Sequence, residues 1–445
     1  MTAPRPTGPG TPRAAWAVLS RLARKAGGPM ERFLRVEAAG GIFLLVAAAA
    51  AFACSNSPWG AGFVRLWQIP VTFQLGDHTF APSLRFLVND GLMVAFFFVV
   101  GLEIRREATG GQLSDARRAA LPAIAALGGM VAPAVIYLAI AGGPLTRRGW
   151  GVPTATDIAF AVGVLTLLGN RVPAALRILL LALAVIDDLG AILVIALFYS
   201  SGVGALGLGI AAAGVAGIGT LRLAAIRHKG AYLVPGAAVC AGIYAAGIHP
   251  TIGGVIVGLL TPARPWPGGG APSAAGAPGD GAGPRAVTSP ADALIATLHP
   301  WVAFLVMPVF ALANAGVVLN GTDFDPVAVR AGVGVAVALV VGKPVGILLF
   351  TAISLRLGLA RLPAGVGWRG LVVLGVVAGI GFTMAIFVAE LAFTAPAPLA
   401  AAKLGVLAAS GGAAAMGLLL GLVLLPRVAR PLRDETEDRT GTTNP

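Results

Sequence analysis

One hydrophobic run, Ile178 to Phe198, carries two adjacent carboxylates at its middle, Asp187 and Asp188. The run has the length that an α-helix needs to cross a hydrocarbon core of roughly 30 Å at about 1.5 Å per residue. Both acids therefore fall near the midplane of a bilayer. A single charge there costs roughly 2.5 to 3.5 kcal/mol on insertion scales, so two neighbouring acids are expected to line water or to meet a partner.

The composition of the whole chain is that of a membrane protein. Hydrophobic residues make up 57% of its 445 residues and charged residues 11%, whereas soluble proteins average about 25% charged residues. The formal net charge of +13 would suggest nucleic acid in a soluble protein. Here the arginines cluster between hydrophobic runs, where they act as orientation signals. Membrane lipids are therefore expected partners, and nucleic acid is not.

Long apolar runs give about twelve candidate membrane helices. They lie at about residues 38–56, 86–104, 119–141, 150–169, 176–199, 203–221, 231–246, 248–260, 294–317, 331–353, 371–393 and 400–425. With this count, most lysines and arginines lie in loops on the side of the amino terminus, which places both termini in the cytoplasm. Counting the short seventh and eighth runs as one helix would move all later loops to the other side of the membrane, and the lysines and arginines would no longer gather on one side. The sequence thus predicts an all-α polytopic membrane protein.

The remaining segments are more polar. Residues 1–36 predict a disordered basic cytoplasmic tail, residues 37–425 the membrane domain, and residues 426–445 a second cytoplasmic tail. Residues 262–290 are dense in Gly, Ala and Pro, a composition that favours a flexible cytoplasmic linker within the membrane domain.

The loop at residues 58–82 is expected outside the cell. Its alternating segment VTFQL is followed by Gly76 and Asp77, and this pattern predicts a short β-hairpin.

Three other predicted helices are interrupted near the midplane. The fourth begins with Pro153, Thr156 and Asp157; the proline disturbs the helix, and hydroxyl and freed carbonyl oxygens become possible cation ligands. The tenth carries Lys343, followed at once by a proline. The eleventh contains the segment GIGFT, residues 379–383, whose glycines favour unwinding.

The interruptions occupy matching places in two halves of the chain. Helices three to five and ten to twelve form two triplets of opposite orientation, and the second member of each triplet, helix four or helix eleven, is broken. Inverted-topology repeats with interrupted, crossing helices at the midplane are typical of secondary transporters.

Several long segments also resemble one known family. VPTATDIAFAVGVLTLLGNRVP, LALAVIDDLGAILVIALFYS, PVFALANAGV, VGKPVGI and GIGFTMAIFVAELAF are similar to characteristic segments of the bacterial NhaA-type sodium/proton antiporters. The resemblance runs in order from about Glu37 to Leu425 and leaves out only the tails and the linker.

The resemblance implies roles for individual residues. Asp188 would be the principal site at which Na⁺ (or Li⁺) and H⁺ compete, and Asp187 would pair with Lys343 when that site is protonated. Asp157 and Thr156 would contribute to the cation site, with Na⁺ held at Asp188 and Asp157, or would balance the dipoles of the crossing half-helices.

Three further residues are candidates for the response to pH. Glu103 and Glu107 match positions that the family ties to pH sensing. Without the resemblance, two glutamates beside two arginines at a helix end are also typical of a solvent-exposed surface. Histidine is the side chain most often used to respond to physiological pH, but His249 lies before Pro250, where a helix-end cap is an equal interpretation. Glu390 is expected to lie near the membrane interface without an assigned role, and Asp90 to make a polar contact inside the bundle.

The expected activity is exchange of cytoplasmic Na⁺ (or Li⁺) for external H⁺, electrogenic at two H⁺ per Na⁺, with pH regulation. It needs no cofactor, is not enzymatic and takes place in the bacterial inner membrane, with a homodimer through loop 58–82 as the family suggests. A sodium-coupled symporter of an organic solute is the nearest alternative. An intramembrane aspartyl protease is less favoured, because adjacent acids on one helix are poorly placed to flank a peptide bond.

Overall fold

The computed structural model describes residues 29–426, apart from residues 77, 112–114, 201, 203, 225, 227, 264–288 and 320–323. Most of the predicted linker, residues 262–290, and the whole of the segments 1–28 and 427–445 lie outside the described residues. The first helix begins at Pro29, so residues 29–36, which the sequence had placed in the amino-terminal tail, are helical.

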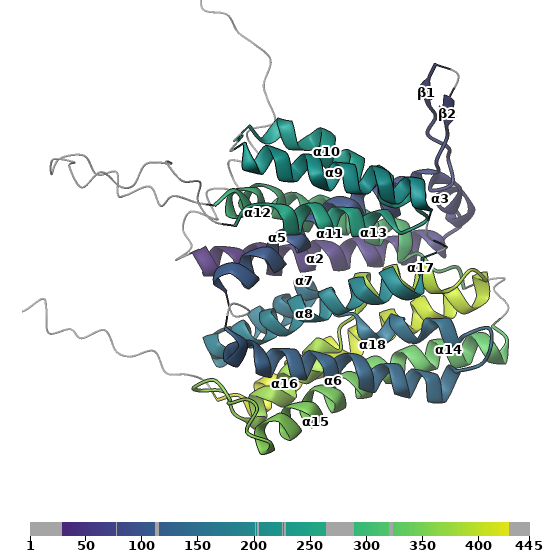
Figure 1. Ribbon diagram of the computed structural model, residues 1–445. Helices are drawn as coiled ribbons and strands as arrows, with labels where there is room; N and C mark the ends of the chain where they lie inside the picture. Colours follow the sequence, from purple (N-terminus) through teal and green to yellow (C-terminus); the bar gives the residue numbers. More distant parts are fainter. Residues whose placement is uncertain are drawn as a thin grey trace, which may run out of the picture.

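Long helices run side by side through the described residues (Figure 1). Each hydrophobic run expected from the sequence contains helix. The first half comprises α2 (Pro29–Ser55), α3 (Gly60–Leu66), α4 (Leu84–Phe86), α5 (Met93–Gly110), α6 (Ala116–Ala141), a 3₁₀ helix (Arg147–Thr154), α7 (Ile158–Leu167), a 3₁₀ turn (Gly169–Arg171), α8 (Ala174–Phe198) and α9 (Ala205–Leu223). The second comprises a 3₁₀ turn (Lys229–Tyr232), α10 (Leu233–Ala245), α11 (Pro250–Leu260), α12 (Pro290–Trp301), α13 (Met307–Asn314), α14 (Pro326–Val337), α15 (Lys343–Arg356), α16 (Trp368–Ala378), α17 (Phe382–Ala392) and α18 (Pro396–Leu424).

Length and composition identify the helices able to cross a membrane. Within the described residues, seven continuous helical segments are long and apolar enough, and two bent helix pairs raise the number to as many as nine. Three shorter apolar helices, at Ala39–Ser55, Gly230–Ala245 and Pro250–Leu260, accompany them. The fold is therefore that of an all-α polytopic membrane protein.

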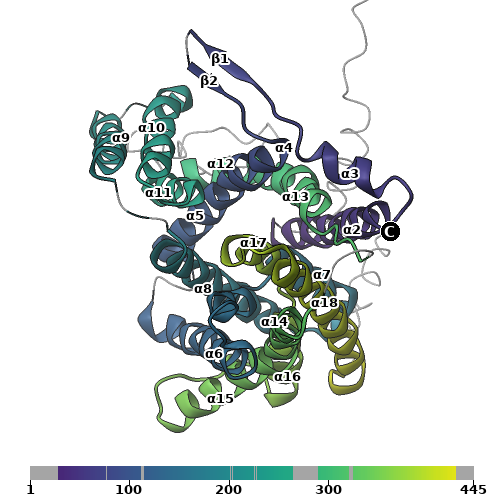
Figure 2. The same cartoon turned by 90° about the vertical axis from the view of Figure 1, so that its right-hand side faces the viewer.

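The helices form two groups when the bundle is viewed along its axis (Figure 2). In one group α5 packs on α11 and α9 on α10; in the other α6 packs on α15 and α14 on α18. The broken elements lie between the groups, since α7 contacts α2, α8 and α18, and α17 contacts α13 and α18.

Glycine allows the closest of these contacts. A Cβ on Gly128 of α6 would lie 2.3 Å from the carbonyl oxygen of Gly346 on α15, a separation that no side chain tolerates. Small residues of this kind let helix backbones approach closely in a membrane, where packing replaces the hydrophobic effect as the force between helices.

Two prolines within helices follow wider, π-helical turns. Val302–Val306 precedes Met307 and Pro308, and Ala338–Gly342 precedes Lys343 and Pro344. Proline lacks an N–H donor, and its ring clashes with the carbonyl of the preceding turn, so an extra residue in that turn relieves both problems. A third such turn, Leu87–Leu92, joins α4 to α5.

The predicted hairpin is confirmed. Strands β1 (Phe73–Leu75) and β2 (His78–Phe80) pair antiparallel, with Phe73 opposite Phe80. Gly76 in the turn has φ of 60°, a conformation that glycine adopts without steric cost. The hairpin projects from one end of the bundle, which we call the hairpin end; the loop between α15 and α16 lies at the opposite end (Figure 1).

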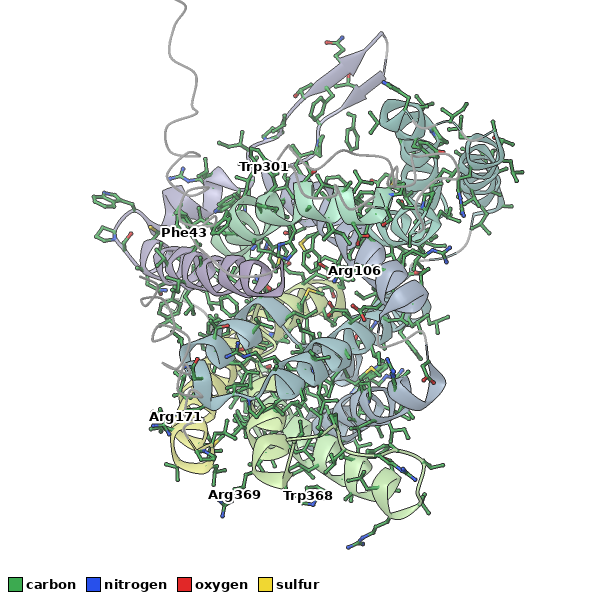
Figure 3. The ribbon with its side chains drawn as sticks, turned by 90° about the vertical axis from the view of Figure 1, so that its left-hand side faces the viewer. Phe43, Arg106, Arg171, Trp301, Trp368 and Arg369 are labelled. Atoms are coloured by element: carbon green, nitrogen blue, oxygen red, sulfur yellow. The ribbon has the colours of Figure 1, made fainter. Side chains whose placement is uncertain are left out.

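Large apolar side chains remain on the outside of the bundle. Leu206 and Leu223 of α9 are 80% and 90% exposed, as expected of helix faces that contact lipid. Figure 3, which views the bundle nearly end-on, shows Trp368 and Arg369 at the start of α16 projecting from the surface.

Candidate ion-binding site

Two helices are broken, as the sequence predicted, and their breaks lie against each other. The 3₁₀ helix Arg147–Thr154 and α7 are bent by 41°, and α16 and α17 by 45°. The backbone N–H of Asp157 donates to the carbonyl of Ile380 at 2.8 Å. This hydrogen bond joins the two unwound segments, so that four half-helix ends meet in one place.

Asp157 lies between the amino ends of α7 and α17. Its Oδ1 accepts from the backbone N–H of Phe160 at 3.0 Å, which caps α7. Its Oδ2 accepts from the backbone N–H of Thr383 at 3.2 Å and also from the Thr383 hydroxyl. A buried carboxylate here satisfies donors that a helix leaves unpaired and meets the partial positive charge of both amino ends.

Lys343 makes a buried ion pair with Asp187. Its Nζ lies 2.5 Å from Asp187 Oδ2, and both side chains are 1% exposed. Lys343 also donates to the hydroxyl of Thr156. The sequence-predicted partnership of a lysine on α15 with an acid on α8 is therefore present in the structure.

Thr156 connects this ion pair to the end of α16. Its Oγ1 lies 2.6 Å from Asp187 Oδ2 and 3.0 Å from the carbonyl oxygen of Ala378. A hydroxyl has one proton, so Thr156 can donate to only one of these acceptors at a time. A change at the ion pair is thereby linked to the carboxyl end of the broken helix α16.

Asp188 has fewer partners than its neighbour. It is 1% exposed, and its Oδ1 is buried without a hydrogen-bond donor, as is Oδ1 of Asp187. The charges that act on it come from Asp187, Glu103, Asp157 and Lys343. Three of these four groups are acidic and one is basic, so the electrostatic surroundings of Asp188 are predominantly acidic.

The chemistry of this site fits a hard cation. Carboxylate, hydroxyl and carbonyl oxygens are the ligands that such ions prefer, and the undonated oxygens of Asp187 and Asp188 have lone pairs to offer. Among the residues that the structure describes, no cluster of three or more His, Cys, Asp or Glu side chains has a metal-binding arrangement.

The three candidates for pH response lie apart from the ion pair. Glu103 and Glu107 are on α5; the charge of Glu103 acts on Asp188, whereas Glu107 lies 3.8 Å from Arg106. His249 precedes α11, where its Nε2 lies 3.1 Å from Asp90 Oδ1. It occupies the cap position but makes no side-chain cap hydrogen bond. Instead its ring packs on Phe387 of α17 at 5.3 Å.

Sequence reasoning missed a buried charge cluster at the hairpin end of α17. Glu390 Oε1 lies 2.5 Å from Lys403 Nζ of α18 and 3.5 Å from Arg85. The Lys403 side chain is only 5% exposed, although the sequence counted this lysine among the charges outside the bundle. Glu390 and Lys403 lie on either side of the short α17–α18 turn, and their opposite charges could have predicted this ion pair.

Thr383 and Ser410 were also missed. Both are buried and hold the amino end of α17, Thr383 through Asp157 and Ser410 through the backbone of Phe382. Hydroxyl residues are common within membrane helices, so nothing in the sequence distinguished these two.

Comparison with known proteins agrees with the geometry. Residues 31–421 match the family model described as Na+/H+ antiporter 1. The chain is 56% identical to Na(+)/H(+) antiporter NhaA 2 of Myxococcus xanthus, with 94% of each chain covered. It is 50% identical to Na(+)/H(+) antiporter NhaA 2 of Sorangium cellulosum, covering 97% of this chain and 98% of that protein. It is also 50% identical to Na(+)/H(+) antiporter NhaA of an Acidovorax species, covering 92% and 96%.

A match over nearly the whole length, at these identities, shows that this chain belongs to the NhaA family of Na⁺/H⁺ antiporters.

Proposed function

We propose that the protein exchanges cytoplasmic Na⁺ or Li⁺ for external H⁺, with Asp188 as the residue at which cation and proton compete. The observation that carries this proposal is the buried Asp188 carboxylate, whose Oδ1 has no donor, near the Asp187–Lys343 ion pair and the two joined breaks. Na⁺ as substrate would be bound by Asp188 and Asp157, with Thr156 as a further oxygen ligand.

The ion pair supplies the second proton in this proposal. When a cation occupies Asp188, its charge weakens the attraction between Lys343 and Asp187, and the pair releases a proton. Asp188 releases another. Two H⁺ then enter for each Na⁺ that leaves, which makes the cycle electrogenic and driven by the membrane potential as well as by ΔpH.

The proposed topology has twelve membrane spans in the inner membrane, with both termini in the cytoplasm. The three short apolar helices complete this number when α2, α10 and α11 each count as a span. Helices three to five and ten to twelve form the inverted repeats. The hairpin end then faces outward, where loop 58–82 is the proposed dimer contact, and lipids surround the exposed apolar faces.

Regulation by pH is assigned to Glu103, Glu107 and His249. Glu103 acts on Asp188 through its charge. His249 contacts α17 through Phe387, and Thr383 of the same helix holds Asp157. These contacts connect His249 with the candidate cation site.

Crowding at the breaks favours an ion over an organic solute. A Cβ on Gly381 would lie 2.9 Å from Cβ of Ala385 and 3.2 Å from the carbonyl of Ala155. Organic substrates need a larger polar pocket, so antiport is preferred to sodium-coupled symport. A protease is disfavoured because Asp187 and Asp188 share one helix and face different partners.

Proteoliposomes test the proposal directly. An imposed Na⁺ gradient should drive H⁺ in the opposite direction, and a membrane potential should alter the rate. Asp188→Asn should abolish this exchange, whereas Asp115→Asn, an exposed acid beside Arg118, should leave it intact. Co-directional movement of Na⁺ and a solute, or full exchange by Asp188→Asn, would overturn the proposal.

A further inference from the structure

The amino end of α17 has no cap of its own. The cap position is Gly381, which has no side chain to offer, and no side-chain cap hydrogen bond forms there. The first N–H groups of a helix have no partner within it, and this helix begins among buried residues. Phe382, its first residue, has φ of 24° and is the only non-glycine residue with positive φ in the described part of the chain.

Two side chains from other elements take the place of the missing cap. Ser410 of α18 accepts from the N–H of Phe382 at 3.0 Å, and Asp157 accepts from the N–H of Thr383 at 3.2 Å. Ser410 is 1% exposed and Phe382 3%. The unusual backbone of Phe382 is thus held by a buried hydroxyl that lies outside the broken helices.

The two acceptors differ in what else they do. Asp157 also caps α7 through Oδ1 and is charged, so an incoming cation competes with α17 for its oxygens. Ser410 is neutral and does not titrate near neutral pH. Its bond to Phe382 therefore does not depend on a protonation change of Ser410 itself.

We propose that Ser410 is a positioning residue for ion exchange: it holds the amino end of α17 in place so that Asp157 can turn from capping to cation binding. This inference rests on the proposed function of Asp157. Without the Ser410 hydroxyl, Asp157 becomes the remaining side-chain acceptor for the first turn of α17. A cation that binds Asp157 then removes the last side-chain hydrogen bond from the amino end of that helix.

The test compares Ser410→Val with Ser410→Thr in proteoliposomes. These side chains have the same shape and differ by a hydroxyl. Ser410→Val should raise the apparent KM for Na⁺ about fivefold or more, because a buried N–H loses its partner, while Vmax at saturating Na⁺ stays within about twofold of wild type. Ser410→Thr should keep KM within about twofold of wild type, since its hydroxyl still accepts.

The pH profile gives an independent readout. At subsaturating Na⁺, weaker cation binding lets protons compete more successfully, so the pH of half-maximal exchange for Ser410→Val should move upward. Ser354→Ala is the matched control, since Ser354 is fully buried on α15 with a hydroxyl that has no hydrogen-bond partner. It should leave both KM and the pH profile unchanged.

The outcomes separate this inference from the proposed function. Wild-type protein that fails to exchange Na⁺ for H⁺ refutes the function itself. Exchange by the wild type with equal KM values for Ser410→Val and Ser410→Thr refutes the role of Ser410 alone. If Ser410→Val is recovered in too small a yield, Ser410→Ala replaces it. A KM for Na⁺ of Ser410→Ala equal to that of Ser354→Ala would then refute the role of Ser410.

Discussion

Asp187 and Asp188 are neighbours in the sequence with different surroundings. Successive residues of an α-helix point about 100° apart, so Asp187 meets Lys343 and Thr156 while Asp188 does not. Both carboxylates keep a buried Oδ1 without a donor, but only Asp187 has a counter-ion and a hydroxyl at its Oδ2. The proposed division of roles, with Asp187 paired to Lys343 and Asp188 open to a cation, rests on this asymmetry.

The Lys343–Asp187 ion pair is expected to affect the stability of the protein. Lys343→Gln should lower the stability by about 3 to 5 kcal/mol, because it leaves the Asp187 charge buried without its partner. The double variant Lys343→Gln/Asp187→Asn should recover most of that loss, since no charge then remains unpaired. Thermal unfolding in detergent measures both, and a double variant no more stable than the single one would contradict the prediction.

Some residues of the site could be predicted from the sequence and others could not. Asp187, Asp188 and Lys343 were recognisable because a charge inside a membrane is costly and needs a reason. Thr383 and Ser410 were not, because their roles depend on which helices cross. The partners of their hydroxyls become known only once the structure shows that the amino end of α17 lies against Asp157 and α18.

At the scale of elements, Asp157 joins two helices. Asp157→Asn leaves one carbonyl oxygen where the carboxylate used two oxygens to accept from Phe160 and Thr383. We expect a loss of about 1 to 2 kcal/mol, the range for removing a helix cap, together with weaker cation binding. Thermal unfolding and Na⁺-dependent exchange measure the two effects. Unchanged stability in this variant would argue against the capping role.

The turn between α17 and α18 carries a prediction of its own. Glu390→Gln should destabilise the protein, because Lys403 and Arg85 would then face each other without a carboxylate. Glu390→Gln/Lys403→Met should be more stable than Glu390→Gln, since the buried lysine charge is gone. Equal unfolding temperatures for the two variants would show that Lys403 reaches water when Glu390 is neutral.

For the molecule as a whole, the hydrophobic runs predicted the positions of the helices well. They predicted the first residues of the helices less well. The breaks at α7 and α17 were predicted, because proline and glycine at midplane depth leave a local signature. The starts of α2 and α18 were missed by several residues, since Pro29 and Pro396 begin helices before the apolar runs do. Proline at a first turn looks like loop in a hydrophobicity scan but is favourable in the structure.

The packing of the two helix groups was beyond sequence reasoning. Nothing in the separate runs showed that Gly128 would meet Gly346, or that His249 would pack on α17. Such contacts depend on the relative rotation of helices that are far apart in the chain. Gly346→Ala should therefore lower stability, because its Cβ would lie 2.0 Å from the Gly128 carbonyl oxygen, whereas Gly91→Ala has open space. Thermal unfolding compares the two, and equal losses would contradict the close approach.

Competition between Na⁺ and H⁺ at Asp188 can be measured by calorimetry on the purified protein. Titrating Na⁺ in buffers of different ionisation enthalpy measures affinity and protons released together. Because the cation displaces protons, affinity should rise with pH, up to about tenfold per pH unit for each proton released. Wild-type protein should bind Na⁺ and release protons, and Asp188→Asn should do neither. Undiminished Na⁺ binding with the same proton release in Asp188→Asn would contradict the account.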